Sequence, residues 1–84
     1  MKPYYDLDLT TRNRIIGLIK QCEISNLGNV SFEYYPTPRN EAKTFHMEQN
    51  NLGWELVVSE RRSGTRDVYE IVGDQITYDY SEKD

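Results

Sequence analysis

Apolar and polar residues alternate with a period of two through most of the C-terminal half of this 84-residue chain. Residues 54–80 contain three such runs, which are separated by the turn-forming dipeptides Ser63-Gly64 and Gly73-Asp74. Alternating runs bounded by glycine-containing dipeptides are typical of antiparallel strands joined by tight turns. This stretch therefore predicts a three-stranded meander.

Two more alternating runs, residues 29–35 and 43–49, precede this meander. Pro36 and Pro38 end the first run, because proline lacks the N–H group that a strand donates to its neighbour. Asn50-Asn51 can supply the positive φ angles of a two-residue turn after the second run. The sequence thus predicts five antiparallel strands in chain order.

Turns centred on these dipeptides, together with a loop over residues 37–42 between the first two strands, predict the pairing of the strands. They place Phe32 opposite Met47, Met47 opposite Trp54, and Leu56 opposite Ile71, while Ile71 also faces Ile76. The hairpins agree on one inward face. Its members are Val30, Phe32, Tyr34, Phe45, Met47, Trp54, Leu56, Val58, Tyr69, Ile71, Ile76 and Tyr78.

A helix is predicted over residues 9–23, where Ile15, Ile19 and Cys22 recur at helical spacing. Asp8 or Thr10 can accept a hydrogen bond as its N-cap. Gly17 lowers helix propensity, so we expect it where the helix approaches the sheet closely. Gly28 suits a left-handed exit from the helix.

These elements predict a single α+β domain over residues 1–84, with one N-terminal helix packed on a five-stranded antiparallel meander. The polar residues 81–84 are expected to form a frayed tail. The one cysteine, Cys22, has no partner for an internal disulfide, and no apolar run is long enough for a membrane helix. We therefore expect a cytoplasmic protein that does not enter a membrane.

The net charge of −4, from 10 basic and 14 acidic residues, argues against direct binding to nucleic acid or anionic membranes. It suits docking on a basic protein surface, although it also serves solubility. The cluster of Arg61, Arg62 and Arg66 is expected to be neutralised by Glu60 and Asp67, which the predicted pairing places opposite each other.

The face of the sheet not covered by the helix is where we expect function. The predicted pairing gives it a row of Glu33, His46, Glu55, Val72 and Gln75, and a second row of Tyr35, Thr44, Val57, Glu70 and Thr77. The first row places the only histidine between two carboxylates. That arrangement is consistent with a charged binding row, with a solvated ladder of charges, or with an acid/base site.

The sequence contains no motif that indicates an enzyme. The chain has no nucleophile motif, no set of metal-ligating residues and no glycine-rich phosphate loop. Cys22 lies on the apolar side of the predicted helix, and this position predicts a small core residue. We therefore expect a protein without enzymatic activity, metal or cofactor.

The segments FEYYP, GWELVVSERRSG, YEI and ITYDY resemble those of small bacterial immunity proteins of polymorphic toxin systems. The resemblance implies a compact acidic α+β domain that binds and blocks a toxin, often a nuclease, inside the producing cell. It covers residues 30–80.

Two functions follow as hypotheses. The first is an immunity protein or antitoxin that blocks a cognate, basic, nuclease-like toxin; the second is a structural or regulatory module that forms a homodimer through its open sheet face or an edge strand. The chain has seven tyrosines, and exposed tyrosines among carboxylates suit a protein interface. The candidate binding residues are Glu33, Tyr35, Glu41, His46, Glu48, Glu55, Glu70 and Asp79.

Overall fold

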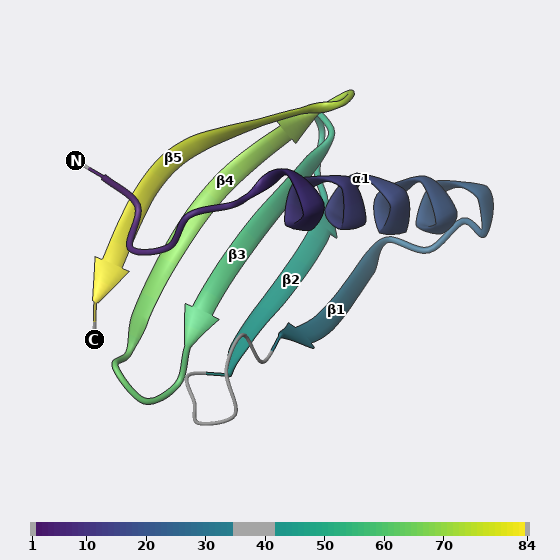
Figure 1. The fold of residues 1–84 in the computed structure, drawn as a ribbon. Coiled ribbons are helices and arrows are strands. Elements are labelled where there is room, and N and C mark those ends of the chain that lie inside the picture. The colour runs from purple at the N-terminus through teal and green to yellow at the C-terminus, as the bar shows by residue number, and fades with distance from the viewer. Residues whose placement is uncertain (1, 35–41, 84) are drawn as a thin grey trace.

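The structure, a computed structural model, describes residues 2–34 and 42–83. Within these residues the chain forms one helix, α1 (Leu9–Ile24), and five strands, which are β1 (Asn29–Tyr34), β2 (Lys43–Gln49), β3 (Trp54–Glu60), β4 (Thr65–Val72) and β5 (Gln75–Lys83). The strands make one antiparallel sheet in chain order, and α1 lies across one face of it (Figure 1). The predicted α+β fold, an N-terminal helix on a five-stranded antiparallel meander, is confirmed.

Helix α1 begins where the sequence predicts. Asp8 is the N-cap, and its carboxylate accepts a hydrogen bond of 2.8 Å from the Thr11 N–H. The hydrogen bond lowers the pKa of Asp8, because it stabilises the ionised carboxylate. At the other end Asn26, with φ of 58°, takes the left-handed conformation. The prediction that Gly28 has this role is wrong.

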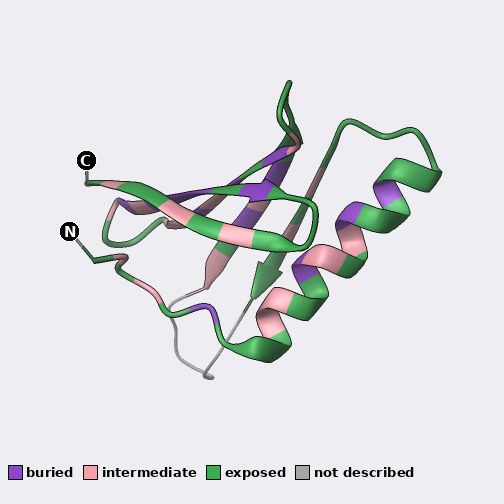
Figure 2. Cartoon of the chain, turned by 90° about the horizontal axis from the view of Figure 1, so that it is seen from above, coloured by how far each residue is buried: buried purple, intermediate pink, exposed green. Residues whose placement is uncertain are grey.

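The helix packs on the sheet through Ile15, Ile19 and Cys22, which are buried. Figure 2 shows these buried turns on the side of α1 that faces the strands. Gly17 lies on the exposed side, and a Cβ atom placed there would meet nothing within 4 Å. The expectation that Gly17 allows a close approach to the sheet is therefore wrong.

The core lies between α1 and the inward face of the sheet. Seven members of the predicted inward set are buried there: Phe45, Met47, Trp54, Leu56, Val58, Tyr69 and Ile71. Four others, Val30, Phe32, Ile76 and Tyr78, are partly buried against them. Tyr34, at the end of edge strand β1, is instead 36% exposed.

Two hairpins differ from the predicted register by two residues. In the β2–β3 hairpin Met47 faces Leu56 rather than Trp54. In the β3–β4 hairpin Leu56 faces Tyr69 rather than Ile71. Side chains alternate between the two faces of a strand, so a shift of two residues keeps each one on its predicted face but gives it a new neighbour.

The β1–β2 pair is also shifted by two residues, because Phe32 faces Phe45 rather than Met47. The two phenyl rings stack with their centroids 4.8 Å apart. In the β4–β5 hairpin the predicted pair of Ile71 and Ile76 is confirmed.

The loops explain the shifts in the two central hairpins, since each is longer than a two-residue turn. The Asn50 side-chain oxygen accepts hydrogen bonds from the N–H groups of Leu52 and Gly53, which closes a four-residue loop after β2. After β3 the Gly64 N–H donates to the Glu60 carbonyl oxygen, and Gly64 has φ of 72°. The Asn50 side chain thus closes the loop, and neither Asn50 nor Asn51 has the positive φ angle that the sequence predicts for a two-residue turn.

Strand β5 is longer than the sequence predicts. A register shift between Val68 and Tyr69 leaves Asp79 without a directly opposite residue, so this strand contains a bulge. Beyond it Ser81 faces Asp67, and β5 continues to Lys83. The expected frayed tail is therefore wrong for residues 81–83, and Asp84 lies outside the described residues.

Asp67 faces the core and is 0% exposed. Its carboxylate accepts hydrogen bonds from the backbone N–H groups of Tyr4 at 3.0 Å and Tyr5 at 2.9 Å, and from the Ser81 hydroxyl at 2.6 Å. The prediction that Asp67 faces Glu60 at the surface is wrong. Asp67 instead fastens the N-terminal segment over β4 and β5.

The N-terminal segment and α1 together cover the inward face of the sheet, with the segment crossing β5 and β4 (Figure 1). The face opposite, which we call the open face, has no element of the described chain packed on it. In residues 2–34 and 42–83 we find no helix with the length and apolar character needed to cross a membrane.

Candidate protein-binding site

The open face is built from three complete rows of side chains that run across all five strands. The acidic row consists of Asn29, Glu48, Glu55, Glu70 and Thr77. The middle row consists of Ser31, His46, Val57, Val68 and Tyr80, and the polar row consists of Glu33, Thr44, Ser59, Arg66 and Glu82.

The acidic row places three carboxylates directly opposite one another on β2, β3 and β4. Glu48 faces Glu55, and Glu55 faces Glu70. All are exposed, and within the described part of the chain Glu55 and Glu70 form no ion pair. Like charges directly opposite each other destabilise a sheet. This row therefore has a cost in stability that the fold itself does not explain.

His46 lies in the middle row, beside the acidic row rather than in it. Its Nδ1 atom is 2.5 Å from the Ser31 hydroxyl, and its Nε2 atom is 3.3 Å from a carboxylate oxygen of Glu48. The prediction that His46 lies between Glu33 and Glu55 is wrong, because the register shift moves both residues into other rows. The imidazole therefore contacts Glu48, one of the three carboxylates of the acidic row.

Apolar side chains flank the acidic row on both sides. In the middle row Val57 is half-buried and Tyr80 is 45% exposed. On the other side, toward the β4–β5 turn, Val72 is 55% exposed and shares the open face of β4 with Glu70. Gly53 holds the loop against the end of β4, since a Cβ atom on it would lie 2.3 Å from the Ile71 carbonyl oxygen.

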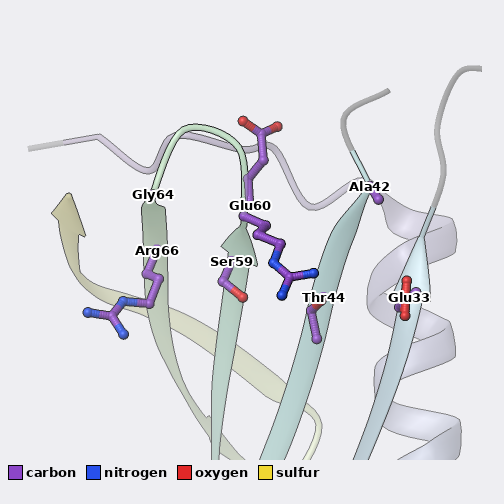
Figure 3. A pocket seen from close by; sticks show the side chains of 8 residues that line it. Glu33, Ala42, Thr44, Ser59, Glu60, Gly64 and Arg66 are labelled. Atoms are coloured by element: carbon purple, nitrogen blue, oxygen red, sulfur yellow. The ribbon is translucent and has the colours of Figure 1, made fainter. Parts of the chain in front are cut away.

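A cavity of about 630 Å³ lies at the polar row (Figure 3). Thr44, Ser59 and Arg66 line it from neighbouring strands, and Glu33 lines it from β1. Its remaining lining residues are Ala42, Glu60, Arg61 and Gly64. Arg66 also pairs with Glu82 at 2.9 Å, so this arginine is neutralised within its own row rather than by Asp67 as predicted.

The structure brings three of the predicted binding residues together and separates others. Glu48, Glu55 and Glu70 become one row, whereas His46 belongs to the middle row beside it and Glu33 to the polar row beyond the middle row. Asp79 is exposed at the bulge of β5. The remaining two candidates, Tyr35 and Glu41, lie outside the described residues.

Tyr80 belongs to this face but was missed as a binding residue. It follows the bulge, which reverses the face that simple alternation predicts for it. The alternation of β5 carries no signal of this bulge, so the sequence alone could not have placed Tyr80 on the open face.

We compared the chain with models of known protein families, with curated proteins and with solved structures, and found no match. Among the described residues, no three His, Cys, Asp or Glu side chains are placed to hold a metal ion. The face therefore presents exposed carboxylates between apolar side chains, an arrangement that can pair with cationic and apolar groups of another protein.

Proposed function

We propose that this chain is a small inhibitor protein, an immunity protein or antitoxin, that binds a basic, nuclease-like toxin through its open face. The observation that carries this proposal is the acidic row, in which Glu48, Glu55 and Glu70 lie side by side on three strands. The resemblance of residues 30–80 to immunity proteins supports it independently.

Inhibition would be both steric and electrostatic. The lysine and arginine side chains that hold substrate phosphates in a nuclease can pair equally with a row of carboxylates. The protein would then occupy the active site and exclude the nucleic acid. Its net charge of −4 would accelerate association, and the association rate would fall as salt concentration rises.

The acidic row also has the energetics expected of a binding surface. Opposed carboxylates destabilise the free protein, and the cations of a partner would relieve that repulsion in the complex. Selection for stability alone favours opposite charges at such positions. The row therefore points to a function that outweighs its cost to the fold.

The test is recovery of the partner from the source cell, followed by co-expression with the recovered toxin. Glu55→Lys should weaken protection strongly, because it places a cation at the centre of the row. The matched control is Asp6→Lys, which changes the net charge equally at an exposed position on the N-terminal segment.

Two results would count against the proposal. If Glu55→Lys protects as well as the wild type, the acidic row is not the interface. If the purification recovers only further copies of this chain, the homodimer is the better explanation, and gel filtration of the pure protein would then give its size.

A further inference from the structure

We infer that the open face receives a helix of the partner, and that this helix carries Lys or Arg at positions i, i+4 and i+7 with apolar side chains beside them. The inference rests on the proposed function, since it names the element through which a basic partner would bind. It comes from the spacing of the rows on the open face.

The length of the acidic row matches a helix better than an extended segment. Neighbouring strands lie about 4.7–4.9 Å apart, so Glu48 and Glu70, with one strand between them, are separated by about 10 Å. Residues i and i+7 of a helix are about 10.5 Å apart along its axis. Three residues on one side of an extended strand span about 13 Å, which exceeds the row.

The width of the surface fits a helix as well. Residues two apart on a strand are separated by about 6.6 Å, so the apolar groups on the two sides of the row are about 13 Å apart. A helix with its side chains is about 10–12 Å in diameter. A helix lying along the row could therefore place apolar side chains against Val72 on one side and against Val57 and Tyr80 on the other.

Charge decides the identity of the occupant. On the open face Arg66 already pairs with Glu82, while the acidic row adds three carboxylates. A second copy of this chain would bring the same negative face, and like charges would oppose its docking. A basic amphipathic helix complements both the carboxylates and the apolar side chains.

The test uses two stapled helical peptides of identical composition, added to the full chain at low salt. In the aligned peptide three lysines occupy i, i+4 and i+7 beside leucines; in the dispersed peptide the lysines are distributed around the helix. We expect the aligned peptide to bind at least tenfold more tightly, with NMR shift changes centred on Glu48, Glu55 and Glu70. Equal affinities, or shift changes centred elsewhere, would overturn the inference.

Variants separate the two kinds of contact. Val72→Gln should weaken binding of the aligned peptide about fivefold to tenfold without changing its salt dependence, whereas Glu55→Gln should reduce the salt dependence. The control is Ile24→Gln, an 86% exposed residue at the end of α1 on the other side of the sheet, which should change neither. If Val72→Gln and Ile24→Gln act alike, the apolar flank has no part in binding.

Failure of this inference can be distinguished from failure of the proposed function. If Glu55→Lys abolishes protection against the toxin while both peptides bind equally, the partner uses another element and only the inference is wrong. If the aligned peptide binds selectively while Glu55→Lys protects fully, the helix site stands and the inhibitor function does not.

Discussion

The hydrogen bonds around Asp67 make the sharpest prediction about stability. This carboxylate is completely buried and accepts from three donors: the backbone N–H groups of Tyr4 and Tyr5 and the hydroxyl of Ser81. The first two donors lie more than 60 residues away in the sequence. Asp67 therefore joins the N-terminal segment to the end of the sheet.

Replacing Asp67 by Ala removes all three acceptor contacts at once. A hydrogen bond to a charged group contributes about 1.5–3 kcal/mol, and an abandoned buried donor adds a desolvation penalty. The full sum will not be reached, because the N-terminal segment can detach and expose Tyr4 and Tyr5 to water. We expect a loss of about 3–5 kcal/mol, comparable to that from breaking a buried ion pair. For a chain of this size that is a large part of the total stability.

Urea unfolding followed by the fluorescence of Trp54, which is 3% exposed, would measure the change. Ser81→Ala is the comparison, since it removes the hydrogen bonds of the Ser81 hydroxyl to Asp67 and to the Tyr78 hydroxyl but keeps both backbone donors in place. It should lower stability by about 2 kcal/mol, which is less than the loss in Asp67→Ala. Hydrogen exchange adds a local measurement, because the amides of Tyr4 and Tyr5 should lose protection in Asp67→Ala. A loss below about 1 kcal/mol, or unprotected Tyr4 and Tyr5 amides in the wild type, would refute this role of Asp67.

Three further predictions concern single positions. Gly53→Ala should destabilise the protein by about 1–3 kcal/mol, because its Cβ atom would lie 2.3 Å from the Ile71 carbonyl oxygen. Gly17→Ala, at a helix position where a Cβ atom meets nothing within 4 Å, should stabilise the protein by about 0.5–1 kcal/mol. Equal effects of the two substitutions in thermal unfolding would contradict both predictions. Glu55→Lys should raise the free energy of unfolding by about 0.5–1 kcal/mol, because it places a cation between the carboxylates of Glu48 and Glu70. A lower free energy of unfolding in urea would show that the three carboxylates of the wild type do not repel one another. Burial raises the pKa of Tyr69 to about 12, so folding favours its neutral form, and this contribution is complete below about pH 10 and is lost as the pH rises through 12. The last step of an ultraviolet titration should therefore disappear in Tyr69→Phe, and its persistence would assign that step to another tyrosine.

The sequence alone determined the elements and the faces of the sheet. Alternation along each run decides which side chains point inward, and this parity survives a shift of two residues in the pairing. The helix was equally local, since Asp8 and the spacing of Ile15, Ile19 and Cys22 define its start and its buried side. The fold class followed from these local patterns.

The rows of the open face were decided only by the tertiary structure. Which residue faces which depends on loop length, and the β2–β3 loop is set by side-chain hydrogen bonds of Asn50 and by the contact of Gly53 with β4. This loop aligns Glu48 with Glu55, and the loop between β3 and β4 aligns Glu55 with Glu70. The predicted pairing placed Glu55 and Glu70 in separate rows and Glu48 in neither of them.

The burial of Asp67 in the core was likewise decided only by the tertiary structure. Its polarity predicts a surface position, and the alternation of β4 alone would have placed it inward. Only the N-terminal segment, which supplies the donors from the far end of the chain, makes burial of the carboxylate favourable. Parity is a property of one strand, whereas register and the partners of a buried charge depend on contacts between segments that are distant in the sequence.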